Sequence, residues 1–474
     1  MKVQPLLVAG AWEESPLPLT TRAPDTGEEV GRTFHATAEQ LNRATEAAVE
    51  AFATTRALAA YERADMLRRI ATGVTARADE LALLLAREAG KPLADARTEV
   101  QRTAFTFQWA AEESQRLNGE LIPLDVLPSS RGKWAITRRV PIGPVAGISP
   151  FNLPLSLSAH KLAPAIAVGD PIVLKPDSRT ACTVLALAEV MAEAGVPAGA
   201  LSVLPMEIEV ADAMVTDDRF ALLSFTGSAR VGWDMKARAG RKPVVLELGG
   251  NAAVIVDADA DLDLVMSRLL VGAFKYAGQI CISVQRVLVH RSRADELRDR
   301  LVQGAESLRV GAATDPGVEI GPMISEQAAR AAKALVDEAV AGGARLLAGG
   351  RQDGSYLSPT VLDGAPEDAA IVREEAFAPV VSIQEFDDIE AAYATVNAGR
   401  FGLQTGVFTR DLTSAWRAFD ALEVGGVIIN DVPTFRVDHM AYGGVKDSGL
   451  GREGVRYAIE HMTELRTMVF TAGG

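Results

Sequence analysis

The stretch VAGISPFNLPLSLSAHKLAPAIAVGDPIVLK, residues 145–175, alternates short β-rich runs with one longer helical run. VAGIS predicts a strand, Leu155 to Val168 a helix and PIVLK a second strand, an order typical of a βαβ unit on a parallel sheet. The alternation continues with a helix at 183–194, the strands LSVLP and ALLSF, a helix from Ala229 and the strand PVVLEL. It indicates a doubly wound half of the nucleotide-binding type.

The segments on either side of this half extend the same pattern. Residues up to about Asn118 are mostly helical, with alanine-rich 3.6-residue periodicity over 39–58, 64–88 and 93–117, and would pack on the sheet. A second alternating half begins near Gly249 and Gly250; it has the strands AAVIVD, RVLVH and SPTVL, helices at 294–308 and 326–341, and a closing strand GGVIIN. The predicted fold class is therefore α/β, with two doubly wound Rossmann-like domains.

Two β-prone segments stand apart from these halves. ELIPLDVL and WAITRRVP, between Gly119 and Pro141, are joined by a turn-forming PSSRG and predict a hairpin, while ELRTMVF at 464–470 predicts a tail strand. Strands with nothing of their own to cover them suggest a subunit interface. We therefore divide the chain into a first domain of 1–118 and 142–248, a second of 249–447, and a small β oligomerisation element of 119–141 and 448–474, which predicts a homodimer or homotetramer.

The composition excludes several classes of protein. The chain has 474 residues, of which 48% are hydrophobic and 23% charged, as in ordinary globular proteins. A net charge of -14 opposes nucleic-acid binding. The start, MKVQPLLVAGAWEE, lacks the pattern of a signal peptide and predicts an edge strand, and the most apolar segment, 162–174, is interrupted well short of the ~20 residues of a membrane helix. We expect a cytoplasmic protein with neither nucleic acid nor membrane as a partner.

Cysteine and histidine usage points away from metals and disulfides. The two cysteines, Cys182 and Cys281, lie far apart and have no CxxC spacing, and the five histidines show no HExxH pattern. No metal is expected, and either cysteine would act as a thiol. Cys182, within the helical run TACTVLALAE, is assigned to packing.

Cys281 and Glu247 are the strongest candidates for catalytic residues. Cys281 lies in YAGQICISVQR, where a helix from about Asp261 gives way to a strand, and Glu247 ends the hydrophobic strand VVLEL before two glycines. A buried cysteine is commonly an inert small hydrophobe, but a buried carboxylate needs a partner or a catalytic role. Together they suit a reaction in which a thiolate forms a covalent intermediate and a carboxylate activates water.

Further candidates follow the predicted strands. Asn152 in PFN can donate to an oxyanion at Cys281, or can be a plain helix N-cap. In FTGSARVG, Gly227 and Gly232 bracket a helix start that, with Ser228, can hold a pyrophosphate, or can form an ordinary turn. Lys175 ends the strand PIVLK, where it can reach a ribose or phosphate, or can be a surface lysine.

Taken in order, these pieces resemble the aldehyde dehydrogenase superfamily over nearly the whole chain. The resemblance rests on PFN at 150–152, VLKP at 173–176, FTGSARVG at 225–232, LELGG at 246–250, GQIC at 278–281, EEAFAPV at 374–380 and YGGVKDSGLGREG at 442–454. A single one of these motifs is a weak signal, whereas their shared order is a specific one.

The resemblance implies a role for each matching residue. Cys281 would be the nucleophile, Asn152 and the Cys281 backbone amide the oxyanion hole, Glu247 the general base and Lys161 an accessory basic residue. Glu375 would hold the nicotinamide ribose near Phe377, Lys175 and Ser178 the adenosine ribose, and Gly227 and Ser228 the pyrophosphate. The implied cofactor site also includes Ile148, Ser149, Pro150, Phe151, Gly232 and Leu248, and the implied substrate pocket Leu153, Leu157, His160, Ile280, Ile282 and Phe435. The first domain would then bind NAD(P) and the second would be the catalytic domain.

The implied reaction converts an aldehyde, NAD(P)+ and water to a carboxylic acid and NAD(P)H. The Cys281 thiolate, with a depressed pKa, would attack the aldehyde carbon, hydride would leave to nicotinamide, and Glu247 would activate water to hydrolyse the thioester. A CoA-acylating dehydrogenase shares the thioester but commonly lacks the base, so Glu247 favours hydrolysis. A non-catalytic structural protein on the same scaffold would be expected to lack the nucleophile or the base.

Departures from the family pattern bear on specificity. Ser178 stands where strongly NAD-selective members tend to have glutamate, and Arg179 is adjacent, so NADP is predicted to be accepted alongside NAD.

Ile280 and Ile282 flank Cys281 and place no cation beside it, which favours a small to medium neutral aldehyde. His160 is either a polar group in the substrate tunnel or an exposed helix residue. The run NDVPTFRVDHMAYGG at 430–444 resembles the lactaldehyde and glyceraldehyde branch, although Arg436 and His439 can instead be interface residues.

Overall fold

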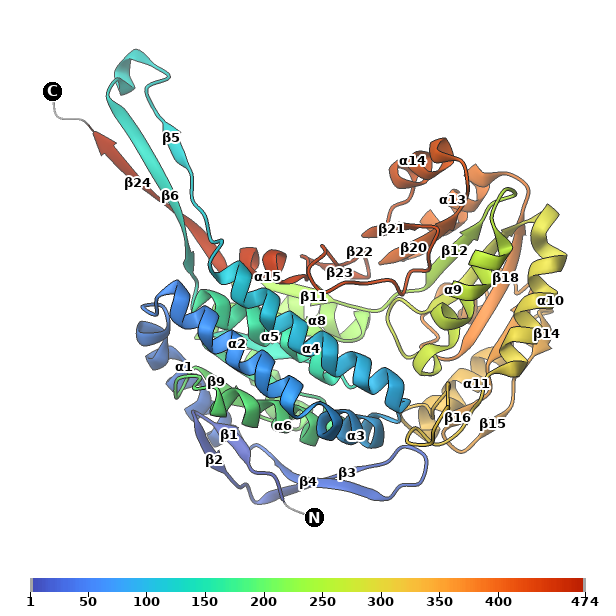
Figure 1. The fold of residues 1–474 in the computed structure, drawn as a ribbon, viewed down its shortest axis with the longest axis horizontal. Helices are drawn as coiled ribbons and strands as arrows, with labels where there is room; N and C mark the ends of the chain where they lie inside the picture. The colour runs from blue at the N-terminus through green and yellow to red at the C-terminus, as the bar shows by residue number, and fades with distance from the viewer. Residues whose placement is uncertain (1–2, 472–474) are drawn as a thin grey trace.

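Two α/β bodies and a narrow projecting sheet make up the molecule, in a computed structural model that describes residues 3–471 (Figure 1). The first body is blue to green and the second yellow to orange in Figure 1, and the chain returns to the first body near its end. Residues 1–2 and 472–474, which belong to the predicted first domain and tail, lie outside the described residues.

The first body is built on an eight-stranded sheet in the order β2-β1-β9-β8-β7-β10-β11-β23. The strands β9, β8, β7, β10 and β11 run parallel, and Ile148 of β7 lies opposite Lys175 of β8 and Phe225 of β10. The N-terminal segment supplies both the edge strand β2 and its neighbour β1. The strands are β1 Leu6–Val8, β2 Ala11–Glu13, β7 Val145–Ile148, β8 Ile172–Lys175, β9 Leu201–Val203, β10 Leu222–Thr226, β11 Val244–Glu247 and β23 Gly449–Leu450.

Helices cover both faces of this sheet because successive strand residues point to opposite sides. In β8, Ile172 and Leu174 join the core beneath α2 to α6, whereas Val173 joins the core beneath α1, α7 and α8. Every residue of α5 is buried, which explains its apolar composition. The helices are α1 Ala38–Thr55, α2 Ala60–Ala76, α3 Ala78–Ala89, α4 Leu93–Ser114, α5 Pro154–Val168, α6 Ala181–Glu193, α7 Ile208–Thr216, α8 Ala229–Arg238 and α15 Val455–His461.

The single helix predicted over 64–88 is wrong, because the structure has two helices that meet at Arg77. Arg77 leaves the helical region, with φ -102° and ψ 20°, and its guanidinium reaches Glu189 of α6 at 3.0 Å. A run of helix-forming residues carries no signal for such a break, because the tertiary contact determines it.

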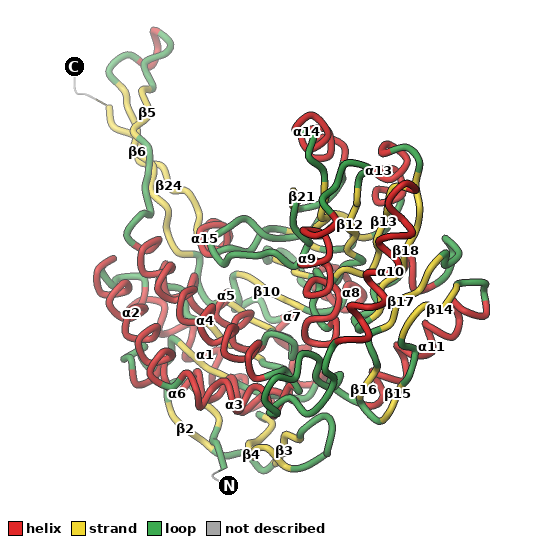
Figure 2. Tube along the Cα trace, turned by 45° about the vertical axis from the view of Figure 1, so that its right-hand side comes forward, coloured by secondary structure: helices red, strands yellow, loops and turns green. Residues whose placement is uncertain are grey.

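The second body is built on a seven-stranded sheet in the order β14-β17-β18-β13-β12-β20-β21 (Figure 2). Its strands are β12 Ala252–Val256, β13 Val284–His290, β14 Arg345–Ala348, β17 Thr360–Asp363, β18 Val380–Phe386, β20 Gln404–Phe408 and β21 Gly426–Ile429. Its helices are α9 Leu262–Phe274, α10 Arg291–Ser307, α11 Glu326–Ala341, α12 Ala370–Arg373, α13 Ile389–Asn397 and α14 Leu412–Ala421. Small ribbons pair β3 Leu17–Arg22 with β4 Glu29–His35, β15 Gln352–Asp353 with β16 Tyr356–Leu357, and β19 Phe401–Gly402 with β22 Val445–Lys446.

The projecting sheet joins the two β-prone segments in the order β24-β6-β5. β5 spans Leu121–Pro123, β6 Lys133–Pro141 and β24 Thr463–Thr471, with Trp134 stacked on Phe470 at 4.1 Å between ring centroids. The tail strand begins at Thr463, so the predicted boundary at 448 is corrected. Residues 449–450 instead add β23 to the first sheet beside β11, because their backbone pairs with Leu246 and Glu247.

Within residues 3–471, no helix has the length and apolarity needed to cross a lipid bilayer. The described part of the chain also contains no group of three His, Cys, Asp or Glu side chains placed to hold a metal ion. Both cysteines are free, and Cys182 is buried in α6.

The edge strand β24 generates a prediction about assembly. Leu465 is 60% exposed and Val469 55% exposed on a strand whose outer edge is open, and such edges pair with other chains. We expect the protein to self-associate through this strand, and Leu465→Lys combined with Val469→Lys to lower its mass in size-exclusion chromatography with light scattering. Leu412→Lys on α14, where the leucine is 72% exposed, is the matched control. An unchanged mass in the double variant would contradict the prediction.

Candidate active site

A strained loop carries Cys281 from the end of α9 to the start of β13. Tyr276, Ala277 and Gly278 have φ values of 50°, 51° and 68°, a left-handed conformation that costs about 1–3 kcal/mol for each non-glycine residue. A side chain at Gly278 would collide with the carbonyl oxygen of Ala378. The Tyr276 hydroxyl donates to the Ala89 carbonyl at 2.9 Å and ties the loop to the first body.

A buried ion pair anchors the same region from the other side. Lys91 donates to the Glu99 carboxylate and, at 2.6 Å, to the backbone carbonyl of Asn152. Glu99 in turn accepts from two backbone N–H groups in the first turn of α5, at 3.0 and 3.2 Å. The Lys91 ammonium lies 4.5 Å from the ring centroid of Tyr276. This one cluster therefore holds both Asn152 and the loop of Cys281.

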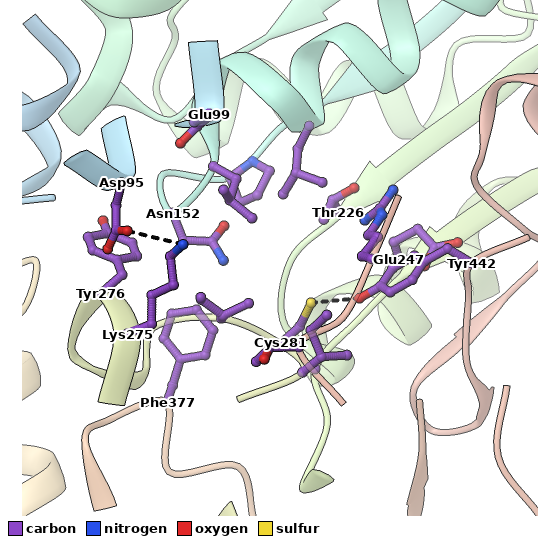
Figure 3. Close-up of a pocket in the computed structure, with 18 of the residues that line it drawn as sticks. Asp95, Glu99, Asn152, Thr226, Glu247, Lys275, Tyr276, Cys281, Phe377 and Tyr442 are labelled. Carbon is purple, nitrogen blue, oxygen red and sulfur yellow. Dashed lines mark hydrogen bonds and ion pairs between the residues drawn. The ribbon is translucent and has the colours of Figure 1, made fainter. Parts of the chain in front are cut away.

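Cys281, Glu247 and Asn152 open into one cavity of about 530 Å³ that lies between the two bodies (Figure 3). Residues from both bodies and from the chain's final third line it. The lining includes the predicted residues Pro150, Phe151, Leu153, Leu157, Gly227, Ser228, Leu248, Ile280, Ile282, Glu375, Phe377 and Phe435. The loop around 434–442 adds Thr434, Arg436 and Tyr442, and α4 adds Arg102.

The depressed pKa expected for Cys281 is wrong for this structure. Burial raises the pKa of the thiol to about 11, against the hydrogen bond from Tyr442 that lowers it. The sulfur lies 2.9 Å from the Tyr442 hydroxyl oxygen, as Figure 3 shows. Desolvation therefore exceeds the stabilisation of the thiolate, and Cys281 rests as a thiol at neutral pH.

Glu247 lies at the carboxyl end of β11 and is 3% exposed. Its two carboxyl oxygens have no hydrogen-bond partner among residues 3–471. Burial, and then the nearby Glu453, raise its pKa well above the ordinary value, while Arg436 and Lys161 act in the opposite direction. An unpartnered buried carboxyl group is poised to take up a proton, as a general base must.

Lys161 lies behind the cavity wall, where its positive charge opposes the negative charges of Glu453 and Glu247. Its ammonium donates to the hydroxyls of Ser224 at 3.1 Å and Thr226 at 2.8 Å, and lies 3.6 Å from a Glu453 oxygen. Burial lowers the pKa of Lys161, and Glu453 and Glu247 oppose that change. Its position indicates an electrostatic role toward Glu247 and Glu453.

Asn152 precedes α5, whose N-cap residue is Leu153, so the plain N-cap interpretation does not apply. The side-chain amide of Asn152 donates to the Gln279 carbonyl at 3.0 Å, within the loop that carries Cys281. In Figure 3 the amide lies on the cavity side of the loop near Cys281. The amide nitrogen has a second hydrogen, which can serve an oxyanion formed at the cysteine.

His160 contradicts both sequence interpretations. It is 2% exposed, so it is not a surface residue, and it does not line the cavity. Its Nε2 atom lies 3.0 Å from Asp438 and 3.1 Å from Arg436. His160 therefore belongs to a buried network behind the loop that forms the wall, and Arg436 faces the cavity instead of a subunit surface.

The nicotinamide end of the predicted cofactor site is formed by Glu375 and Phe377. Glu375 accepts from the backbone N–H of Gly250 at 3.1 Å, and burial raises its pKa to about 7. A side chain at Gly249 would collide with this carboxylate. Phe377 packs edge-to-face on Phe151, with ring centroids 6.0 Å apart.

The pyrophosphate end lies at the start of α8. Gly227 and Ser228 line the cavity, and Ser228 is the N-cap residue without a side-chain cap, among the residues that the structure describes. Gly232 has a different role, because a side chain there would meet Leu248 and Phe225, so this glycine allows α8 to pack on the sheet. Ser149 bonds to the Ser158 hydroxyl at 2.9 Å, and Ile148 ends β7 beside Lys175.

The adenosine end of the predicted cofactor site contains His35, a residue that sequence reasoning missed. Lys175 ends β8, and the Ser178 hydroxyl lies 3.1 Å from Nε2 of His35, whose Nδ1 is 2.7 Å from Glu207. Arg179 is occupied elsewhere: it pairs with Asp177 at 2.8 Å and stacks over the Phe151 ring at 4.2 Å.

These features fit a dinucleotide. The uncapped N-terminus of α8 offers backbone N–H groups to a pyrophosphate. Lys175 and Ser178 follow β8 at the carboxyl edge of the parallel sheet, where such ligands bind. Gly249 lets the Glu375 carboxylate approach the chain closely, at the place where a ribose hydroxyl would need an acceptor.

Sequence reasoning did not identify Tyr442, Arg102, Lys91, Glu99 or His35 as functional residues. Tyr442 lies in a motif that was used only for the family resemblance. Arg102 is one of several arginines on exposed helical patterns, and no local signal separates it from the others. These residues reach the site only through tertiary contacts.

Comparison with known proteins agrees with the arrangement. The model of the aldehyde dehydrogenase family matches residues 12–468. A 3-sulfolactaldehyde dehydrogenase of Priestia megaterium is 42% identical over 465 residues, which are 98% of this chain and 97% of that protein. A lactaldehyde dehydrogenase of Methanocaldococcus jannaschii is 40% identical over 415 residues, 86% of this chain and 88% of that protein.

Two solved structures are also similar to this chain in fold and sequence. Aldehyde dehydrogenase 21 from Physcomitrella patens, in complex with its reaction product succinate, superposes with a TM-score of 0.98 at 45% identity and covers 99% of this chain and 98% of that chain. An NADP-dependent glyceraldehyde-3-phosphate dehydrogenase from Bacillus halodurans, complexed with NADP, has a TM-score of 0.97 at 35% identity, with 99% and 100% covered.

The raised pKa of the Cys281 thiol generates a pH prediction. Because the pKa of Cys281 is raised to about 11, the rate of its alkylation by iodoacetamide should keep rising with pH up to about pH 10 in the cofactor-free protein, with no plateau near the ordinary cysteine pKa of about 8.5. The rate is measured by mass spectrometry of the peptide that contains Cys281. Cys281→Ala is the control in which any remaining alkylation of the protein occurs at Cys182. A plateau at or below about pH 9 would contradict the prediction.

Proposed function

The chain belongs to the aldehyde dehydrogenase family, and from this premise we propose that it oxidises a short aldehyde to the carboxylic acid with NAD(P)+ and water. The observation that carries the proposal is the convergence of a thiol, an unpartnered carboxyl group and an amide donor on one cavity: Cys281, Glu247 and Asn152. Nucleophile, base and oxyanion donor are the parts that acyl transfer through a thioester requires.

The first half of the reaction begins when the Cys281 thiolate forms a bond to the aldehyde carbon. The carbonyl electron pair moves to oxygen, and the Asn152 amide and the Cys281 backbone N–H donate to that oxyanion. Removing one such donor costs about 2.7–4 kcal/mol in comparable sites. A bound NAD(P)+ would supply the hydride acceptor, and loss of hydride from the carbon attached to Cys281 would leave a thioester on that residue.

The second half needs Glu247 as a carboxylate. Glu247 takes a proton from water as the water oxygen bonds to the acyl carbon; the carbon–sulfur bond then breaks, and its electron pair returns to Cys281. The cations Lys161 and Arg436 favour the charged form of Glu247, whereas burial and Glu453 favour the protonated form. These opposing influences suit a group that must both release and take up a proton near neutral pH.

The cofactor would be held between the carboxyl edge of the first sheet and residues of the second body that follow α12. Glu375 and Phe377 would hold the nicotinamide end, the start of α8 the pyrophosphate, and Lys175 with Ser178 the adenosine ribose. Ser178 places no carboxylate at that ribose, which supports acceptance of NADP as well as NAD. Arg179 is paired with Asp177, so it adds no free charge there.

The substrate class we propose is a short aldehyde with an anionic group at its far end. The absence of a cation beside Cys281 favoured a neutral aldehyde, but Arg102 and Arg436 line the cavity. Arg436 is buried against Tyr442 and Glu453. Arg102 pairs with Asp438 and stays partly exposed, so Arg102 is the guanidinium that can meet an anionic group. The names of the relatives and structures support this class, since they include 3-sulfolactaldehyde dehydrogenase and a complex with succinate. A small neutral aldehyde is the second candidate substrate, because the relatives also include lactaldehyde dehydrogenases.

The domain roles follow from this proposal. We assign cofactor binding to residues 3–118 and 142–248, the catalytic role to 249–447, and self-association to 119–141 and 463–471. We also propose a cytoplasmic location, because both cysteines are free thiols.

Glu247→Gln tests the hydrolytic half of the reaction. We expect one turnover of reduced nicotinamide per active site to remain, while the steady-state rate falls about 10²–10⁴-fold, as measured by stopped-flow absorbance. Because burial raises the pKa of Glu247, its stabilising contribution is lost as pH rises through that pKa, so the glutamine variant should keep an equal or higher Tm at pH 8.

The controls separate this reaction from its alternatives. Cys281→Ala should lose the single turnover as well as the steady state. Restoration of the Glu247→Gln rate by added CoA would support acyl transfer to CoA, and full steady-state activity of that variant without CoA would contradict the role of Glu247 as base.

Arg102→Gln tests the substrate class. Arg102 also pairs with Asp438 and its side chain is 28% exposed. We expect kcat/KM for 4-oxobutanoate to fall about 10–100-fold, the range for a lost hydrogen bond to a charged group, and kcat/KM for butanal to change less than about threefold. Arg268→Gln is the matched control, since Arg268 lines the same cavity and pairs with Asp431. Equal losses for both aldehydes would contradict an anionic substrate.

A further inference from the structure

We propose that Tyr442 is a catalytic residue whose phenolic O–H donates to the Cys281 sulfur and stabilises the thiolate, both as nucleophile and as leaving group. The proposal deepens the proposed function and rests on Cys281 being the nucleophile. The geometry that supports it is a 2.9 Å contact between the Tyr442 hydroxyl oxygen and the Cys281 sulfur, inside the cavity that both side chains line.

The backbone of Tyr442 is fixed on the first body. Its N–H donates to the Glu453 carbonyl at 3.0 Å, and its carbonyl accepts from the Glu453 N–H at 2.6 Å. The side chain is 3% exposed. A ring held in this way keeps its hydroxyl at the sulfur without a further loss of conformational entropy when the thiolate forms.

Arg436 holds the other face of the tyrosine ring. Its guanidinium carbon lies 3.8 Å from the ring centroid, and its Nη2 atom lies 3.0 Å from a Glu453 oxygen. A cation over the ring withdraws electron density from the phenol, which strengthens its O–H as a donor. Arg436 therefore acts on Cys281 through Tyr442 as a positioning residue.

The direction of the hydrogen bond follows from the charge on sulfur. A neutral thiol can donate to the phenol oxygen or accept from it, but a thiolate has no proton and can only accept. Burial raises the pKa of Tyr442 well above its ordinary value. The phenol therefore keeps its proton and donates once Cys281 has ionised.

The surroundings of the sulfur make this donor necessary. Ile280 and Ile282 on either side of Cys281 carry no charge. Glu375, from the segment after α12, and Glu247, from β11, both raise the pKa of the thiol, while Arg436 lowers it from behind the tyrosine ring. Tyr442 is the side chain that offsets the desolvation of the sulfur by direct contact.

The same hydrogen bond acts in both halves of the reaction. In the first, it stabilises the sulfur electron pair before that pair forms the carbon–sulfur bond. In the second, water adds to the thioester, the carbon–sulfur bond breaks, and the electron pair returns to sulfur as a thiolate. The phenol keeps its own proton throughout, and the proton that the Cys281 thiol loses when the thiolate forms passes to Glu247, the base of the proposed function.

The test is Tyr442→Phe, which removes one oxygen and keeps the ring beneath Arg436. In the cofactor-free protein we expect iodoacetamide to alkylate Cys281 about three- to tenfold more slowly at every pH from 7.5 to 9.5, because a higher thiol pKa is partly offset by higher nucleophilicity. We expect kcat/KM for the best aldehyde to fall about 10–100-fold, with the Kd for NADP+ unchanged in fluorescence titration. Tyr393→Phe on α13 is the matched control for loss of a buried phenol.

A second substitution keeps the test decisive if Tyr442→Phe folds poorly. Site-specific Tyr442→3-fluorotyrosine keeps the hydroxyl and makes it a stronger donor, so alkylation at pH 8.5 should become faster. A rate equal to wild type in either variant that folds would overturn the role of Tyr442. Because Cys281→Ala and Glu247→Gln test the dehydrogenase reaction itself, a failure of the Tyr442 proposal is distinguishable from a failure of the proposed function.

Discussion

The buried ion pair between Lys91 and Glu99 is the interaction on which the site depends. Both side chains are 2% exposed or less, and removing one partner of such a pair costs about 3–5 kcal/mol because the other charge stays buried. Lys91 holds the Asn152 carbonyl and lies against Tyr276, and Glu99 caps the first turn of α5. The pair thus fixes Asn152 and the loop that carries Cys281 relative to each other, although the two segments are more than a hundred residues apart in the chain.

Desolvation is the largest influence on the pKa values of the groups in this site. Burial raises the pKa of both the Cys281 thiol and the Glu247 carboxyl, and lowers that of Lys161. Each of these shifts favours the neutral form of the group, and the charged forms depend on particular neighbours. Tyr442 contacts the sulfur directly, while Lys161 and Arg436 act on Glu247 through space.

Much of the fold was accessible from local patterns, and the misses have physical causes. The alternation around 145–175 predicted β7, α5 and β8 because apolar periodicity reports which face of an element is buried. The break at Arg77 was missed because it depends on a contact with α6. The oligomerisation element was started at 448, ahead of its strand, because residues 449–450 are too few to show a pattern and are ordered only by pairing with β11. His160 was misread because its burial comes from Asp438 and Arg436, which lie far along the chain.

The sequence by itself determined the α/β class and the order of the family motifs, and through the resemblance it supplied the candidate site residues Cys281, Glu247, Asn152 and Glu375. Those features are local, since each strand end and glycine pair is readable within a few residues. Only the tertiary structure decided that Tyr442 meets the sulfur, that Arg102 and Arg436 face the cavity, and that the thiol rests protonated. Hydrogen bonds and desolvation depend on distances between segments remote in sequence, and no local pattern encodes those distances.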